Sequence, residues 1–422
     1  MAQSVSPEVV TFDEFPVTGL LPKDSTQASS FRAETQCDGR RARIAVFDTG
    51  VDLGCAGLQV TTEGKRKVIE AVDCSGAGDT AMTDAAVAED GTLTLKSGRK
   101  VQVPETWEAT EFKTGLKHAA DFFPGPLMKR IKDVRADEFK SQREQLRAEL
   151  LRQKSDENEK EQKTLIDEFD ALAQEDFGPV YDVIAWKKND EWYATLLEYG
   201  RDVAEALPPM RNFRVAQESA QLCAQSQLHV ALNTYDDGNV VSVVAPNGSH
   251  GTHVAGIASA HFPDAADGHL DGVAPGAQVV SCVIGDCRVG TMETVQALSR
   301  AMRVAVEMQV DVINLSYGES MAIHSSGFLR DQVRQLSQQH GVLFVSSAGN
   351  SGPLLSTIGA PAATCPEMMS IGAFVTPAML AAEYNLLKHE SFEERNMFTW
   401  SSRGPNDGGG LGVSVCAPGA AI

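Results

Sequence analysis

The stretch RIAVFDTG at residues 43–50 joins a short apolar run to a polar turn that holds Asp48. Continuous apolar runs of about five residues are typical of buried strands in a parallel sheet. Four similar runs follow: VVSCVIGD (279–286), DVINLSYG (311–318), VLFVSSAGN (342–350) and MMSIGAF (368–374). The repeated pattern indicates that all five segments belong to one sheet.

The segments between these runs have the periodicity of amphipathic helices. Apolar residues recur at helical spacing in TMETVQALSRAMRVAVEM (291–308) and in GFLRDQVRQLSQQHG (327–341). Strands that alternate with helices predict an α/β fold, a doubly wound and mainly parallel sheet with helices on both faces. Ligands bind such sheets beyond the carboxyl ends of the strands, where Asp48, Ser316 and Asn350 fall.

Residues 61–240 have a different pattern and interrupt this sheet. Alternating segments around turn residues predict hairpins at GTLTLKSGRKVQV (91–103), YDVIAWKKNDEWYATL (181–196) and LHVALNTYDDGNVVSVV (228–244). A long stretch of mixed charge between them predicts a solvated helix or helical hairpin. We therefore divide the chain into an N-terminal segment (1–40), a core split over 41–60 and 241–422 and incomplete at its C-terminus, and an α+β insertion (61–240).

Composition narrows the classes of partner. The 422 residues carry a net charge of −20, which disfavours nucleic acid and anionic membranes and favours cationic groups such as a peptide's ammonium end. The N-terminus MAQSVSPEVVTFDEF has no secretory-signal pattern, and no run approaches the ~18 apolar residues of a membrane-spanning helix. Eight scattered cysteines without a CxxC pair are typical of reduced thiols, so we expect a cytoplasmic protein.

The stretch SHGTHVAG (249–256) places His250 and His253 three residues apart. Zinc hydrolases usually offer HExxH; here the spacing is shorter, no glutamate intervenes and no third ligand is evident. A loop histidine satisfied by hydrogen bonds is the structural alternative. A third interpretation is that one of the two histidines is a catalytic base. THVAGIASA resembles a helix start after Thr252, which puts His253 in the first turn, where the helix dipole disfavours imidazolium.

A histidine base needs an orienting acid, and FDTGVD (47–52) offers Asp48 and Asp52. Asp48 closes the predicted strand, whereas Asp52 falls in the following turn. Alone, Asp48 is more typical of a turn-capping residue. With the histidine motif downstream, we interpret Asp48 as the acid that fixes the tautomer of His253.

Six motifs together resemble the subtilisin-like serine peptidases, in that family's chain order. They are IAVFDTGVD (44–52), SHGTHVAGIAS (249–259), GVAPGAQVVSCVIGD (272–286), DVINLSYG (311–318), VSSAGNSGP (345–353) and WSSRGP with VSVCAPGAAI (400–405, 413–422). The resemblance implies that Asp48 and His253 are triad members and that Asn350 donates to the oxyanion. It also implies that the backbone at Ser316 and Gly318 pairs with substrate. On its residues alone, Asn350 is equally typical of a turn.

The long insertion, with FPVTGLLPK (15–23), LSYGES (315–320) and FTWSSRGP (398–405), resembles the branch of this family that releases tripeptides. That resemblance implies that Glu293 and Glu319 hold the free α-ammonium of an oligopeptide. It also implies homo-oligomers in the full-length protein and no metal or cofactor. Without it, Glu293 fits the first turn of a helix and Glu319 a solvated loop.

The family's serine stands in Gly-Thr-Ser at the head of a helix, and these 422 residues contain no such tripeptide. Ser75, Ser249 and Ser351 have glycine neighbours, but none follows the final strand at a helix start. We therefore expect no peptidase activity from this chain alone. Two alternatives stay open: a catalytically dead interaction module that uses the charged helices, and an endopeptidase that cleaves blocked peptides.

Overall fold

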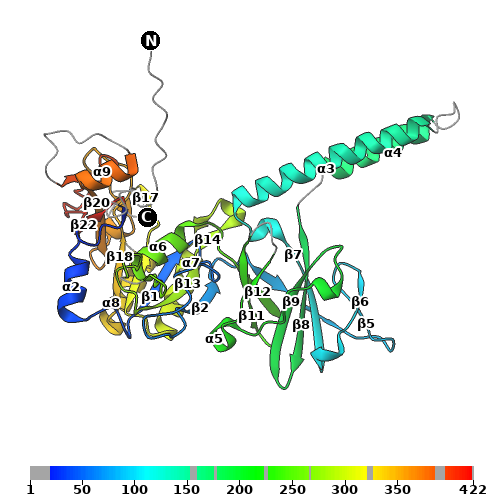
Figure 1. The fold of residues 1–422 in the computed structure, drawn as a ribbon, viewed down its shortest axis with the longest axis horizontal. Helices are drawn as coiled ribbons and strands as arrows, with labels where there is room; N and C mark the ends of the chain where they lie inside the picture. Colours follow the sequence, from blue (N-terminus) through cyan, green and yellow to red (C-terminus); the bar gives the residue numbers. More distant parts are fainter. Residues whose placement is uncertain are drawn as a thin grey trace, which may run out of the picture.

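The computed structural model of the chain describes residues 20–152, 159–174, 178–222, 227–265, 268–320, 327–384 and 395–420. These residues form a core built on one sheet, with an insertion beside it and a helical arm that projects from the insertion (Figure 1). In spatial order the sheet contains β2 (Val68–Asp73), β13 (Gln278–Val283), β1 (Arg43–Asp48), β16 (Val312–Leu315), β18 (Leu343–Ser347), β20 (Met369–Val375) and β21 (Asn396–Met397), and β22 (Val415–Pro418) also pairs with β20. Only the pairing of β20 with β21 is antiparallel among these described strands. The five predicted strands and the mainly parallel sheet are confirmed.

Helices cover both faces of this sheet, as the sequence predicts. Successive strand residues point to opposite faces. In β1, Ala45 and Phe47 therefore pack with α7 (Val295–Glu307) and α8 (Phe328–His340). Val46, between them, packs on the other side with residues of α6 (His250–Ser259). The strand is buried on both faces, which explains its continuous apolar sequence.

The insertion contains two four-stranded sheets and a small hairpin. One sheet is β10 (Ala220–Gln221), β11 (His229–Tyr235), β12 (Val240–Val244) and β3 (Asp79–Ala81); the other is β4 (Thr83–Ala85), β7 (Glu111–His118), β8 (Val180–Lys188) and β9 (Glu191–Glu198). The hairpin pairs β5 (Thr92–Thr94) with β6 (Lys100–Gln102). All three predicted hairpins, β5–β6, β8–β9 and β11–β12, are confirmed.

The predicted boundaries of the insertion are wrong at both ends. β2 pairs with β13 in the core sheet, so the insertion begins after Asp73 rather than at residue 61. β12 belongs to an insertion sheet, so the insertion ends near Val244. The sequence of β2 hid its place because Glu70 interrupts the apolar pattern. Glu70 is nonetheless 2% exposed, since its carboxylate pairs with Arg214 of the insertion.

The projecting arm is a helical hairpin of α3 (Gly125–Arg152) and α4 (Glu159–Gln174) (Figure 1). The rings of Phe139 and Phe169 meet edge to face at 5.8 Å, and Arg143 pairs with Asp170 at 2.7 Å. The predicted charged helical hairpin is thus confirmed. None of the described helices is both long and apolar enough to cross a membrane. The other described α-helices are α2 (Ala28–Thr35), α5 (Phe213–Ala216) and α9 (Pro377–Tyr384).

Candidate active site

Asp48 is the last residue of β1, and it is completely buried. A buried carboxylate is costly unless hydrogen bonds compensate for its lost hydration. The backbone amide of Thr49 donates to Asp48 Oδ1 at 2.7 Å. The other principal partner is an imidazole, that of His250, whose Nδ1 lies 2.8 Å from Oδ1 and 3.0 Å from Oδ2.

This contact orients the His250 ring for base chemistry. With a proton on Nδ1 directed at the carboxylate, the lone pair of Nε2 is free to accept a proton. Within the described part of the chain, Nε2 makes no hydrogen bond. The side chain is 53% exposed, so an incoming group has access to that nitrogen.

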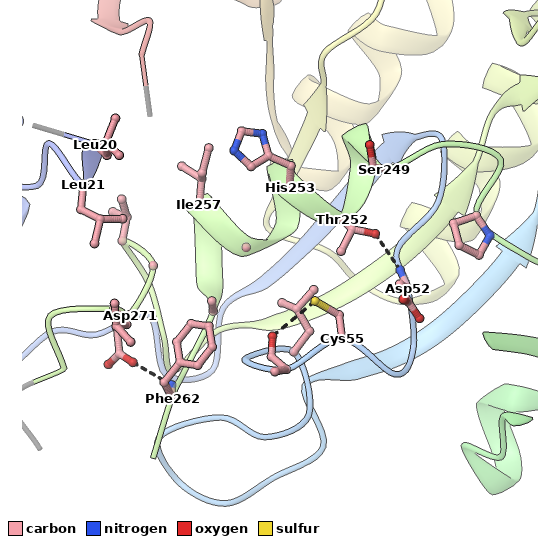
Figure 2. Close-up of a pocket in the computed structure, with 18 of the residues that line it drawn as sticks. Leu20, Leu21, Asp52, Cys55, Ser249, Thr252, His253, Ile257, Phe262 and Asp271 are labelled. Atoms are coloured by element: carbon pink, nitrogen blue, oxygen red, sulfur yellow. Dashed lines mark hydrogen bonds between the residues drawn. The ribbon is translucent and has the colours of Figure 1, made fainter. Parts of the chain in front are cut away.

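The prediction that Asp48 orients His253 is wrong, because the helix begins three residues earlier than expected. α6 starts at His250, which therefore occupies the first turn. Thr252 does not precede the helix; its Oγ1 accepts a hydrogen bond from the amide of Asp52 at 2.9 Å. His253 is exposed and, with Ile257, lines an apolar cavity of about 830 Å³ (Figure 2). Asp48 is not among the residues that line this cavity.

The pKa of His250 is raised from its ordinary value. The hydrogen bond to Asp48 is the main cause, and the carboxylate's negative charge adds to it, while partial burial acts in the opposite direction. The helix dipole at this first turn disfavours imidazolium, but the hydrogen bond to the buried Asp48 carboxylate outweighs it at His250.

We expect an NMR titration of the 422-residue chain to show a His250 pKa above 6.5, and Asp48→Asn to lower it. Because the folded-state pKa exceeds the unfolded one, the ion pair stabilises the fold below the unfolded pKa. That contribution is lost as pH rises through the folded pKa. The stability gap between wild type and Asp48→Asn, measured by urea unfolding, should therefore narrow as pH rises. The titration of exposed His340 serves as the control; an unchanged His250 pKa in the variant would contradict the pairing.

Asn350, Ser316 and Gly318 emerge at the same edge of the sheet as Asp48. β16 and β18 run parallel to β1, with Phe47 opposite Leu315 and Leu315 opposite Ser346. Asn350 is exposed just after β18, and Ser316 Oγ accepts from the Asn314 amide at 3.0 Å. A Cβ on Gly318 would lie 2.4 Å from the Ala360 carbonyl oxygen, so only glycine fits there. The roles assigned to the three residues stay predictions.

Glu293 and Glu319 interact electrostatically, and each lies on a short strand that follows a strand of the core sheet. Glu293 lies in β15 (Met292–Glu293), paired with β14 (Gly285–Asp286), so its predicted place in the first turn of a helix is wrong. Burial raises the pKa of Glu293, and the charge of Glu319 raises it further. Glu319 lies exposed in β17 (Glu319–Ser320). Two carboxylates in mutual repulsion form a site that a cation would stabilise.

Tyr317 links the two parts of the site and is a residue that the sequence did not single out. Burial raises its pKa, and so do the negative charges of Asp48 and Glu293. An added Cβ on Gly285 would lie 3.1 Å from its hydroxyl oxygen. In the sequence, the only indication that Tyr317 belongs to the site is its position between Ser316 and Gly318 in LSYG.

The zinc alternative gains no support from the site. Across the described residues, no group of three or more His, Cys, Asp or Glu side chains is placed to hold a metal ion. The Nδ1 atom of His250 is already engaged by Asp48.

The sequence profile of the Subtilase family matches residues 39–421. The chain belongs to the subtilase family. This subtilase is 36% identical over 430 residues to tripeptidyl-peptidase 2 of Oryza sativa subsp. japonica, covering 96% of this chain and 31% of the relative. It is 37% identical to tripeptidyl-peptidase 2 of Arabidopsis thaliana, with the same coverage of 96% and 31%.

A solved structure agrees with these sequence relatives. The crystal structure of tripeptidyl peptidase 2 matches this subtilase with a TM-score of 0.71 and 28% identity, over 96% of this chain and 32% of that chain. The subtilase described here thus spans about a third of the length of the relatives it matches. The subtilisin-like fold is confirmed.

Proposed function

We propose that this subtilase is the N-terminal part of a serine peptidase of the tripeptidyl-peptidase 2 type. Its reaction is the release of tripeptides from the free N-termini of oligopeptides. The observation that carries the proposal is the contact between the buried Asp48 carboxylate and His250 Nδ1 at 2.8 Å. The similarity to tripeptidyl-peptidase 2 over 96% of the chain supports the narrower activity.

In the proposed mechanism, His250 Nε2 takes the proton of a serine hydroxyl as that oxygen attacks the scissile carbonyl. The imidazolium then gives the proton to the leaving amine, while Asp48 stays ionised and stabilises it. The side-chain amide of Asn350 donates to the oxyanion. Among the described residues, no serine hydroxyl is hydrogen-bonded to His250 Nε2, and we propose that the full-length protein supplies the attacking serine.

Specificity for a free N-terminus comes from Glu293 and Glu319 in this proposal. Burial makes a lone carboxylate costly, and the two carboxylates repel one another. A substrate ammonium relieves both costs. The two glutamates lie at a fixed place relative to His250. Binding the substrate ammonium there therefore sets the number of substrate residues between the N-terminus and the cleaved bond.

We further propose that the enzyme works in the cytoplasm, as a homo-oligomer, without a metal or cofactor. None of the seven described cysteines forms a disulfide, which fits a reducing compartment. Cell fractionation and light scattering of the full-length protein test these two points. A disulfide-bonded, secreted protein would contradict the cytoplasmic location, and a monomer would contradict the homo-oligomer.

Sequencing the transcript past codon 422 is expected to reveal a Gly-Thr-Ser, and the full-length chain to hydrolyse tripeptidyl coumarin amides with a free amine. The 422-residue chain alone should show no turnover above that of its His250→Ala variant, because loss of the nucleophile costs about 10⁶ in kcat, a value measured in subtilisin, a family member. Inhibitor-sensitive turnover by the 422-residue chain would contradict this expectation. A continuation without such a serine would favour the alternative of a catalytically dead interaction module. If the full-length chain cleaved N-blocked peptides as fast as free-amine peptides, the endopeptidase alternative would be favoured.

A further inference from the structure

Asp48 and His250 are 202 positions apart in the chain, so tertiary contacts must hold them in register. The hydroxyl of Thr49 makes two of these contacts. It accepts a hydrogen bond from the amide of Gly251 at 2.9 Å and donates one to the carbonyl of Gly248 at 3.1 Å. The two partners flank His250 in the chain.

The same residue also holds the acid. The Thr49 amide donates to Asp48 Oδ1 at 2.7 Å, and its carbonyl accepts from the amide of Asn247 at 2.8 Å. Thr49 is 8% exposed, so water competes little for these bonds. A threonine hydroxyl has one proton to donate, and here Gly248 receives it.

The contact replaces a missing local cap. The first amides of a helix have no partner within the helix, and a side chain at the N-cap usually satisfies one of them. Ser249, the N-cap of α6, makes no side-chain cap bond. Thr49 supplies that bond from the end of the strand that carries the acid. A Cβ on Gly251 would lie 2.4 Å from the Gly50 carbonyl oxygen, so strand and helix start are in close contact there.

We propose that Thr49 is a positioning residue for the Asp48–His250 pair. Its hydroxyl caps α6 from outside the helix and fixes the His250 imidazole at hydrogen-bonding distance from Asp48. The role rests on the proposed function of that pair. Thr49 acts through His250 and not on the substrate.

The first test is kinetic and uses the full-length protein with Thr49→Val, which keeps the shape and removes both hydroxyl bonds. We expect kcat to fall about 10- to 100-fold, because a misplacement of about 1 Å costs up to 10² in rate. KM should change little. Thr49→Ser, which keeps the hydroxyl, should restore most of the activity.

The matched control is Thr195→Val. Thr195 is a fully buried threonine of β9 whose hydroxyl donates to the Leu207 carbonyl at 2.6 Å, within the insertion. The Thr195→Val variant loses a comparable hydrogen bond at a position that does not touch the site, so its kcat should stay at the wild-type value. If Thr49→Val does not fold, Thr49→Ala replaces it, with folding checked by circular dichroism. A kcat loss shared with Thr195→Val would overturn the proposal.

The second test is a titration that needs no activity. In the 422-residue chain, Thr49→Val should lower the pKa of His250 towards the value in Asp48→Asn, because a looser helix start weakens the contact with the carboxylate. Wild-type kcat and an unchanged His250 titration in Thr49→Val would overturn the positioning role. If His250→Ala retains activity in the full-length protein, the proposed function itself fails, and the two failures are thus distinguishable.

Discussion

Replacing His250 by alanine in the full-length chain is expected to lower kcat about 10⁶-fold, the loss measured for the corresponding change in subtilisin. His253→Ala should leave kcat close to the wild-type value, because the imidazole that contacts the Asp48 carboxylate is that of His250. The physical reason is the position of the two rings. His250 Nδ1 contacts the buried Asp48 carboxylate, whereas His253 is exposed on α6 and lines the cavity of Figure 2.

The two alanine variants are each other's control, since they remove the same side chain from one short helix. Steady-state kinetics on a free-amine tripeptide substrate gives the comparison, and urea unfolding checks that both variants fold. If His253→Ala abolished turnover while His250→Ala retained it, the base would be His253 and the contact with Asp48 would be incidental.

The second large effect is expected at the paired carboxylates. Glu293→Gln should lower kcat/KM on free-amine substrates about 30- to 4,000-fold, because breaking one desolvated charge pair costs about 2–5 kcal/mol. Cleavage of an N-acetylated substrate should change little, since it has no ammonium to lose. A double variant with Glu319→Gln should lose more on the free-amine substrate than either single variant.

Glutamine keeps the size of the side chain, so this comparison isolates charge. Glu138→Gln, at an exposed position on the α3 arm, is the matched control and should retain wild-type selectivity. Because the pKa of Glu293 is raised, selectivity for the free amine should weaken as pH falls through it. Equal losses on free and blocked substrates would contradict recognition of the ammonium.

The sequence by itself determined the core sheet and its functional edge. Strands β1 and β13 are buried on both faces, and β16, β18 and β20 are buried on one face and partly covered on the other. Their apolar runs are therefore continuous and visible in the sequence. Asp48 and Asn350 end or follow such strands, and parallel strands bring those ends to one edge. The insertion hairpins were visible for a similar reason, because alternation and turn residues such as Asp237 and Gly238 are local signals.

Tertiary structure alone decided which histidine meets the acid. Serine and threonine are both N-cap residues, so local rules allow a helix start after Ser249 or after Thr252. The sequence prediction placed the start after Thr252 and so favoured His253. In the fold, Thr49 caps the helix from a strand about two hundred positions earlier, and α6 begins at His250. The sequence also did not reveal β2 as a core strand, because its Glu70 is buried only by pairing with Arg214 of the insertion. A hydrogen bond between distant segments leaves no periodicity in the sequence, so only the folded chain reveals it.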